Sequence, residues 1–299
     1  MTRRAWWAFA VMSVVWGASY LLIKIAINGG MPAPDVAWLR VALAAVILMV
    51  LAWRGGALPT LSGRWRWVLA YAVAEISIPF PLIAAGEVHI ASSLAAIVIA
   101  SVPLIVTVLS LRFDPSERPT PMRALGLGIG FAGVIALVGL DVAGNSEEVL
   151  GALAVLVGAV GYAIGPMLVK LGMEGIDSRA AMGASLLIAT VILAPVAAVD
   201  TPSRTPTFGA FAAVAALGVF CTALAFVVYT VLVREAGTGR ATIITYINPL
   251  VAVVLGVTLL GERPGPSALA GLVLILAGSW LSTGGGRRSP GRLGAAKVR

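Results

Sequence analysis

Charged residues are scarce in this chain. Asp, Glu, Lys and Arg make up 11% of its 299 residues, whereas soluble proteins carry about 25%. Hydrophobic residues make up 60%, and the mean hydropathy is +1.00. A chain of this composition has too little polar surface to cover a water-soluble globule, which excludes a soluble domain.

Residues that build catalytic and metal sites are also rare. Cys221 is the single cysteine, so no intramolecular disulfide can form and the redox compartment stays open. The chain has one histidine, His89, and lacks a Walker loop and the HExxH, GxSxG, CxxC and dinucleotide motifs. We therefore predict no enzyme, no metal site and no cofactor, and we disfavour an ATP-driven pump.

Long apolar runs fill the rest of the chain. A helix of about 20 apolar residues crosses a ~30 Å hydrocarbon core, and the first run is too long for a signal-peptide core. Runs this long and apolar are helices, because only helices or closed barrels satisfy their backbone in lipid. The sequence predicts an all-α membrane protein with ten transmembrane helices, near residues 5–27, 35–53, 67–86, 91–111, 122–140, 149–169, 179–198, 208–233, 241–260 and 266–282.

The basic residues predict the orientation of these spans. With the N-terminus in the cytoplasm, Lys and Arg fall in the inward connections and at the two ends, except for four: Lys24, Arg40, Arg204 and Arg263. This is the positive-inside pattern, so we predict cytoplasmic N- and C-termini. It also accounts for the net charge of +8 without a nucleic-acid partner. The basic tail, residues 284–299, is expected to be disordered and to contact anionic lipid.

The chain contains an internal repeat. Residues 117–121 (Glu-Arg-Pro-Thr-Pro) match residues 262–266 (Glu-Arg-Pro-Gly-Pro), and Gly126 and Gly133 match Gly271 and Gly278 at the same offset. The match predicts a first five-helix repeat in residues 1–144 and a second in residues 145–283.

An odd number of spans per repeat makes the two copies cross the membrane in opposite directions. Inverted repeats of this kind are typical of secondary transporters, because two copies of one scaffold can exchange conformations. The alternative is that duplication only built a larger helix bundle.

Prolines inside spans point to bent helices. Pro103 and Pro249 fall in repeat-related spans, where each removes a backbone hydrogen bond. Bent helices that meet near the midplane point to a substrate site, although a passive kink is the alternative. The hinge or gating candidates are Pro79, Pro103, Pro166 and Pro249, and the polar neighbours Ser101, Tyr246 and Asn248 are candidates for contact with solute.

Glu75 is the one carboxylate expected deep inside a span, about 12 Å from Trp67 along a helix. A buried carboxylate is costly and faces a cavity or a partner. Glu75 can bind a substrate ammonium, carry a proton, or form a structural hydrogen bond while protonated. The aromatic candidates for the same path are Trp16, Tyr20, Tyr71 and Tyr162.

Three further ionisable residues have a functional and a plain interpretation. Lys24 and Arg40 can meet a substrate carboxylate, or they can snorkel or pair with an acid. His89 can sense pH, or it is simply solvated in an outer turn.

These residues resemble the EamA family of the drug/metabolite transporter superfamily. The resemblance rests on Trp16-Gly17-Ala18-Ser19 with Lys24, on Arg40, and on Pro103 and Pro249, each followed by a Glu-Arg pair (Glu117-Arg118 and Glu262-Arg263). It implies a ten-helix inverted repeat with a central cavity lined by spans 1, 3, 4, 6, 8 and 9. It also implies a bacterial inner-membrane carrier that exports amino acids or related metabolites. Span 7 departs from the pattern, because it lacks a counterpart of Arg40.

An apolar interior with few fixed charges and several aromatic residues favours aromatic or other neutral amino acids as substrates, exported by alternating access through a monomer. Two alternatives stay open. The chain can be a proton-coupled exporter of cationic lipophilic drugs that uses Glu75, or a non-transporting membrane scaffold or enzyme.

Overall fold

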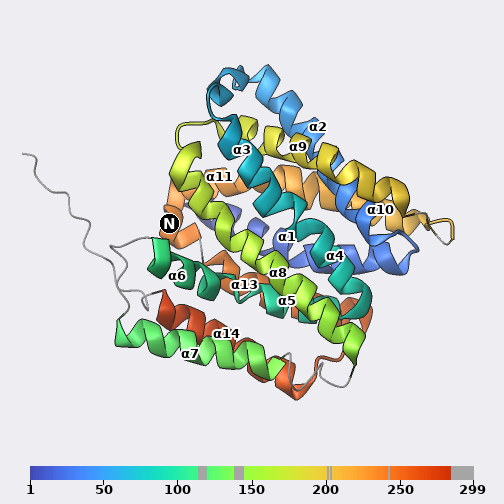
Figure 1. Cartoon of the computed structure of the whole chain (residues 1–299), viewed down its shortest axis with the longest axis vertical. Helices are drawn as coiled ribbons and strands as arrows, with labels where there is room; N and C mark the ends of the chain where they lie inside the picture. The colour runs from blue at the N-terminus through green and yellow to red at the C-terminus, as the bar shows by residue number, and fades with distance from the viewer. Residues whose placement is uncertain (114–119, 138–144, 201, 203, 242, 284–299) are drawn as a thin grey trace, which may run out of the picture.

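The computed structural model describes residues 1–113, 120–137, 145–200, 202, 204–241 and 243–283, and all regular structure in them is helical (Figure 1). Predicted residue Glu117 and the predicted tail, residues 284–299, lie outside the described residues. The helices are α1 (Arg3–Asn28), α2 (Ala33–Arg54), η1 (Leu58–Leu61), α3 (Trp65–Tyr71), η2 (Ala72–Ser77), α4 (Pro79–His89), α5 (Ser92–Ile99), α6 (Val102–Phe113), α7 (Pro121–Ala136), α8 (Ser146–Leu168), η4 (Val169–Met173), α9 (Ser178–Val199), α10 (Phe208–Ala216), η5 (Leu217–Leu224), α11 (Ala225–Ala236), α12 (Thr238–Ala241), α13 (Ile244–Leu260) and α14 (Pro266–Ser282).

Helix length and apolarity confirm a multi-pass membrane protein. In the part of the chain that the structure describes, seven helical stretches are long and apolar enough to cross a bilayer. Three shorter apolar helices, α7, α13 and α14, lie where the fifth, ninth and tenth spans were predicted. Apolar side chains also cover the exterior: Ile135 and Val191 are about 70% exposed. Such a surface is stable only against lipid or another apolar partner.

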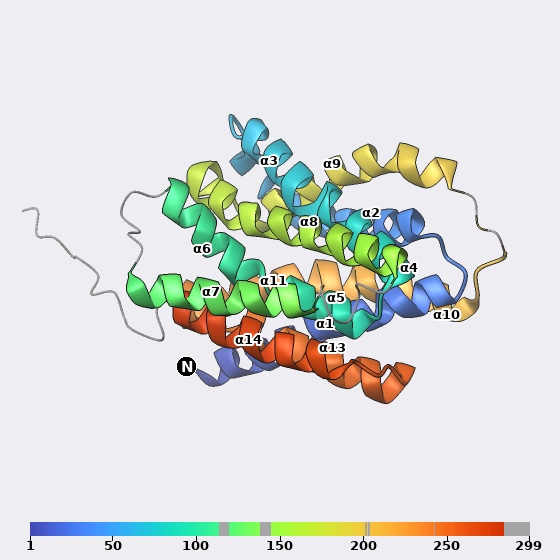
Figure 2. The same ribbon diagram turned by 60° about the horizontal axis from the view of Figure 1, so that its bottom comes forward.

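The duplicated glycines meet across a pseudo-twofold axis. Helices α7 and α14 pack against each other, and the two views show them side by side (Figures 1 and 2). A Cβ atom on Gly126 would touch Gly278, and one on Gly133 would touch Gly271. Gly126 corresponds to Gly271 in the repeat, and Gly133 corresponds to Gly278. The repeat therefore maps each of these two contacts onto the other, as in an isologous interface. The contacts also run antiparallel, so the first residues of α7 and α14 lie at opposite ends of the bundle.

The same exchange relates other parts of the two halves. Helix α2 packs on α9, and the Trp38 indole donates to the carbonyl of Thr190 at 3.1 Å. The π-helical segments η2 and η5 interrupt the third and eighth spans at matching positions. Such interruptions leave irregular backbone in the middle of a span, which is frequent at functional sites.

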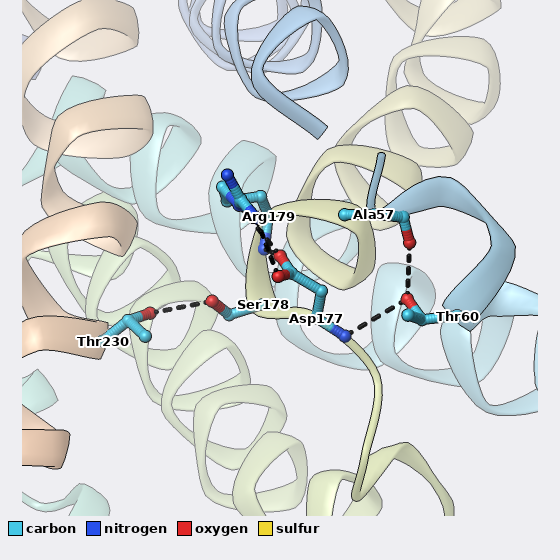
Figure 3. Close-up of polar contacts among 6 residues, drawn as sticks. All are labelled: Ala57, Thr60, Asp177, Ser178, Arg179 and Thr230. Carbon is cyan, nitrogen blue, oxygen red and sulfur yellow. Dashed lines mark hydrogen bonds and ion pairs between the residues drawn. The ribbon is translucent and has the colours of Figure 1, made fainter. Parts of the chain in front are cut away.

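Loop contacts tie the two halves together at both ends. At the end that carries the N-terminus, the Asp177 amide donates to the Thr60 hydroxyl at 3.2 Å, and Thr60 donates in turn to the Ala57 carbonyl (Figure 3). Asp177 also caps α9 and is paired with Arg179, which lowers its pKa below the ordinary value. At the other end, the amide of Thr207 donates to the Gly29 carbonyl at 2.9 Å.

The two proline-containing spans differ more than the sequence predicts. The fourth span is broken between α5 and α6, and Pro103 lies in the first turn of α6. Helix α13 instead continues through Pro249, which lies in its first half. Pro79 begins α4 directly after the π-helical segment η2, and Pro166 lies inside α8 just before η4.

We predict that Gly278→Ala destabilises the protein. The added methyl group would collide with backbone atoms of Gly126 and Gly130, which cannot move as a side chain can. Overpacking of this kind costs roughly 1–3 kcal/mol. The melting temperature of the detergent-purified protein should fall for Gly278→Ala and should not fall for Gly128→Ala, because a Cβ atom on Gly128 meets no neighbouring atom. Equal melting temperatures for the two variants would refute the close α7–α14 contact.

Candidate functional site

One face of α1 carries the candidate residues. Trp16, Tyr20 and Lys24 are spaced four residues apart, so their side chains follow one another along a helix face at about 6 Å per step. None of the three is fully exposed. Trp16 contacts Tyr229 of α11, with 5.3 Å between ring centroids. The predicted residues of the first span thus face the interior of the bundle rather than lipid.

Arg40 is the central charge of this interior. It is 7% exposed and lies in the second turn of α2. Its Nε and Nη2 donate to the Thr222 hydroxyl of η5 at 3.4 and 3.3 Å, and its guanidinium lies 4.3 Å from the centroid of the Phe80 ring. Among the described residues Arg40 therefore has no acid within ion-pair distance, and it lies inside the bundle.

Aromatic rings surround this cation. Phe80 of α4 packs edge-to-face on Tyr162 of α8, with 6.3 Å between centroids. Arg40 is also close enough to Tyr20 and Tyr162 to act on both electrostatically. We call Tyr20, Arg40, Phe80, Tyr162 and Thr222 the central cluster. Its members come from the first, second, third, sixth and eighth spans, so both halves contribute.

Glu75 lies on the side of the central cluster toward the N-terminal end. It sits in the π-helical segment η2, where its Oε2 packs against Gly165 of α8. That oxygen is buried and has no hydrogen-bond partner among the described residues. The hydroxyl-bearing rings of Tyr71, Tyr162 and Tyr229 lie within electrostatic reach of this carboxyl. Glu75 is therefore an interior acid among aromatic residues, as the sequence predicts.

Glu75 is not the only buried acid. Glu87, near the end of α4, is 0% exposed, and neither of its carboxyl oxygens has a described hydrogen-bond partner. Lys24 lies beside it but donates to backbone carbonyls, that of Glu87 at 2.6 Å and that of Ile90 at 2.9 Å. Lys24 thus caps the C-terminal end of α4, a favourable place for a cation. The Lys24 ammonium is therefore already used by backbone carbonyls, in place of the predicted contact with a substrate.

Glu262 closes the end of the bundle above Glu87. Its Oε1 accepts from the amide and hydroxyl of Ser92, both at 2.8 Å, and its Oε2 accepts from the Ser93 amide at 2.9 Å. A carboxylate from the α13–α14 loop therefore caps α5, 170 residues away in sequence. Partial burial works to raise the pKa of Glu262, but hydrogen bonds from Ser93 and Ser92 outweigh it and hold the pKa below its ordinary value.

Several predicted residues do not join the central cluster. The Ser101 hydroxyl donates locally to the Val98 carbonyl of α5, and the Tyr246 hydroxyl meets that of Thr283 near the end of the bundle. The Asn248 amide, in the orientation that satisfies both of its groups, donates to carbonyls of Ile244 and Ser13. Tyr246 and Asn248 thus hold separate helices together, and Ser101 stabilises the break in the fourth span. His89 is half exposed, and its Nδ1 lies 3.5 Å from Oε2 of Glu147 at the start of α8.

Sequence reasoning missed Glu87, Phe80, Thr222 and the partner of Glu262. The predicted third span ends at residue 86 and so leaves Glu87 outside it, whereas α4 continues to His89. Three turns of helix separate Glu75 from Glu87, and this spacing was an available signal. The sequence gives no comparable signal for Thr222 and Phe80, because their contacts with Arg40 depend on where α2 packs.

Two hollows on the molecular surface lie away from these residues. One is lined by Arg3, Trp6, Trp7 and Ala10, and the other lies between the start of α2 and the end of α9. Both are shallow and almost wholly apolar, as expected of grooves filled by lipid chains.

A helical bundle with an apolar exterior, a duplicated design and an unpaired interior cation defines a multi-pass membrane transporter. The comparisons agree. The chain belongs to the EamA-like transporter family, whose model matches residues 4–139 and again residues 149–284. This confirms the family that the sequence motifs predict.

Individual relatives cover most of the chain. An uncharacterized inner membrane transporter, YedA, of Escherichia coli (strain K12) is 30% identical over 85% of this chain and 82% of that protein. A probable terminal-alkyne amino-acid exporter of Streptantibioticus cattleyicolor is 30% identical over 97% of this chain and 95% of that protein. A solved crystal structure with 21% identity has a TM-score of 0.66 and covers 95% of this chain and 97% of its own, which shows the shared fold.

We predict that Glu262→Ala lowers stability in a pH-dependent way. The lost helix cap should cost roughly 1–2 kcal/mol at neutral pH. Because the folded-state pKa of Glu262 is lowered, its contribution is present above the unfolded-state pKa and is lost as the pH falls through the folded-state value. Melting temperatures measured from neutral to acidic pH should therefore converge for wild type and variant.

The matched control is Glu174→Ala, since Glu174 is exposed and forms no hydrogen bond or ion pair with another described side chain. It should leave the melting temperature unchanged. A difference for Glu262→Ala that stays constant at every pH would contradict a cap made by an ionised carboxylate.

Proposed function

We propose that this protein is a secondary transporter of the bacterial inner membrane that exports amino acids or related small metabolites, and that it is not an enzyme. Aromatic and other neutral amino acids are the proposed substrates. The name of one relative, a probable amino-acid exporter, supports this substrate class. The observation that carries the proposal is the buried, unpaired guanidinium of Arg40 inside a cluster built by both halves.

Arg40 suits a carboxylate. A guanidinium presents donors in a planar fork that matches a carboxylate in two parallel hydrogen bonds. In this structure the fork makes only long bonds to one hydroxyl and stacks on Phe80, so donors remain for a ligand. An ion buried without a partner is costly. A site that receives an anionic group gives a reason to keep it.

The remaining parts of an amino acid have complementary partners nearby. The unpartnered Oε2 of Glu75 suits an ammonium group, and the rings of Tyr162 and Phe80 suit an apolar or aromatic side chain. Glu75 also favours the second candidate function, export of cationic lipophilic drugs, in which it binds the cation and Arg40 plays no direct part.

We propose ten transmembrane spans arranged as two inverted five-helix repeats, residues 1–144 and 145–283. The antiparallel contacts of α7 with α14 support the inversion. Basic residues gather at the end that carries the N-terminus, with Arg54, Arg64 and Arg66 among them, which supports cytoplasmic termini. The protein is proposed to work as a monomer in contact with lipid.

Alternating access would use the irregular helices. The π-helical segment η5 contains Thr222, the segment η2 precedes the helix that carries Phe80, and the fourth span is broken beside Pro103. Irregular backbone of this kind can change conformation without unfolding a whole span. Pro79, Pro166 and Pro249 are proposed as further hinge positions.

We predict that Arg40→Lys weakens transport of carboxylate-bearing solutes. Lysine keeps the charge but loses the planar fork and the stacking on Phe80. Loss of a charged hydrogen bond, worth about 1.5–3 kcal/mol, corresponds to a half-saturation concentration roughly ten to a hundred times higher. Counterflow of labelled amino acids in proteoliposomes measures this value.

The control for that experiment is Arg179→Lys. Arg179 is paired with Asp177 outside the central cluster, so this change should leave counterflow intact. If Arg40→Lys and the wild type show equally efficient counterflow of amino acids, Arg40 is not part of the substrate site.

We predict that Glu75→Gln reduces transport or flattens its pH dependence while the protein still folds. The amide cannot carry a negative charge, so it loses the attraction for an ammonium group. Uptake is measured across a pH series, beside a melting curve. Unchanged uptake at every pH would show that Glu75 is structural. If the wild-type protein exchanges only lipophilic cations, the drug-exporter function is favoured. If it moves no solute at all, the remaining interpretation is a non-transporting scaffold.

A further inference from the structure

Glu87 is a buried carboxyl that the proposed substrate site does not use. It lies in the last turn of α4 and is 0% exposed. Neither oxygen has a hydrogen-bond partner among the described residues. Its position is also unfavourable for a negative charge, because the C-terminal end of a helix carries partial negative charge. The structure therefore holds an acid where an ion is poorly tolerated.

The groups around Glu87 come from several helices. Lys24 and Tyr20 of α1, Arg40 of α2 and Glu262 of the α13–α14 loop all lie within electrostatic reach of its carboxyl. None of the cations among them forms an ion pair with it. On the side of α8, Glu147 is paired with His89 and is largely exposed.

The carboxyl lies beneath the contact made by Glu262. The α4–α5 turn follows Glu87 directly and ends at Ser92 and Ser93, whose amides Glu262 binds. While this contact is made, Glu87 is sealed from the end of the bundle. If α5 moves away from the α13–α14 loop, the contact breaks and the path to Glu87 opens at that end.

The surroundings favour a proton over other cations. Lys24 and Arg40 would repel a metal ion or an ammonium group, and one carboxyl with no other described free oxygen ligand cannot supply the six ligands of a hard metal ion. A proton needs only one carboxyl oxygen and removes the negative charge from the buried site. Protonation therefore relieves the cost of burial with no further ligand.

We propose that Glu87 is a proton-binding site that couples export to proton entry, with the Glu262 contact to Ser92 and Ser93 as the gate above it. This rests on the proposed transport function. Export would then be an antiport. A proton binds a Glu87 oxygen when the Glu262 end is open, and it leaves to the opposite side when substrate binds near Arg40. The O–H bond formed on one side breaks on the other, so one proton crosses inward for each turnover.

The test compares two readouts in proteoliposomes made with wild type, Glu87→Gln and the exposed control Glu174→Gln. Counterflow of labelled amino acids reports exchange, which needs no net proton movement. A pH-sensitive dye trapped inside reports protons moved when a substrate gradient is imposed. Wild type and Glu174→Gln should show both signals. Glu87→Gln, which resembles the protonated state, should keep counterflow and lose the proton signal.

The outcomes separate the two proposals. Absence of amino-acid counterflow in wild type would overturn the proposed function itself. Counterflow in wild type without any proton signal would overturn proton coupling alone. A proton signal that persists in Glu87→Gln would assign coupling to another group and remove Glu87. Because counterflow requires a folded carrier, its retention in the variant also shows that the variant is folded.

Discussion

The structure depends on one constraint: hydrocarbon offers no hydrogen-bond partner, so the protein itself must satisfy each polar group inside a span. Most interior groups obey it. Ser13 and Thr190 donate to the preceding turn of their own helices, Trp38 reaches a carbonyl of the facing helix, and Lys24 caps the end of α4. Glu75 and Glu87 are the ionisable exceptions among the described interior residues, and Arg40 has only the Thr222 hydroxyl as a hydrogen-bond partner among them. Polar groups that a membrane protein leaves unsatisfied mark the positions where a ligand, a proton or a conformational change supplies the missing partner.

The scaffold of this transporter is symmetric, but its chemistry is not. Repeat-related glycines meet in pairs between α7 and α14, and the π-helical segments η2 and η5 occupy matching positions. The interior charges Arg40, Glu75 and Glu87 all come from the first half: the repeat mate of Glu75 is Cys221, and that of Arg40 is the buried Leu186. Duplication thus supplies two similar halves, while the first half alone carries the charged groups of the proposed substrate site. Thr222 shows how the second half still takes part, because it holds Arg40 from the facing side.

Much of the fold could be predicted from the sequence, since apolar run length and the repeated glycines depend on local composition alone. The aromatic face of α1 and the interior position of Glu75 follow from spacing in the same way. The rest depends on tertiary contacts. Lys24 looks like a ligand-binding cation, but its ammonium is used by the end of α4. Tyr246 and Asn248 look like site residues beside a kink, but α13 begins so close to them that they lie toward the end of the bundle. Glu87 was missed because the last helical turn of a span cannot be located from hydropathy.

The central claim is that solute binds within the bundle beside Arg40, and the single cysteine allows a direct test in the unaltered protein. Cys221 is 4% exposed and lies next to Ser19 and within electrostatic reach of Arg40. The measurement is the rate at which a small water-soluble thiol reagent alkylates Cys221, with and without amino acids. The account predicts slow alkylation, through the open states of the transport cycle, that transported amino acids slow further. An alkylation rate that no transported solute alters would contradict a substrate site at the central cluster.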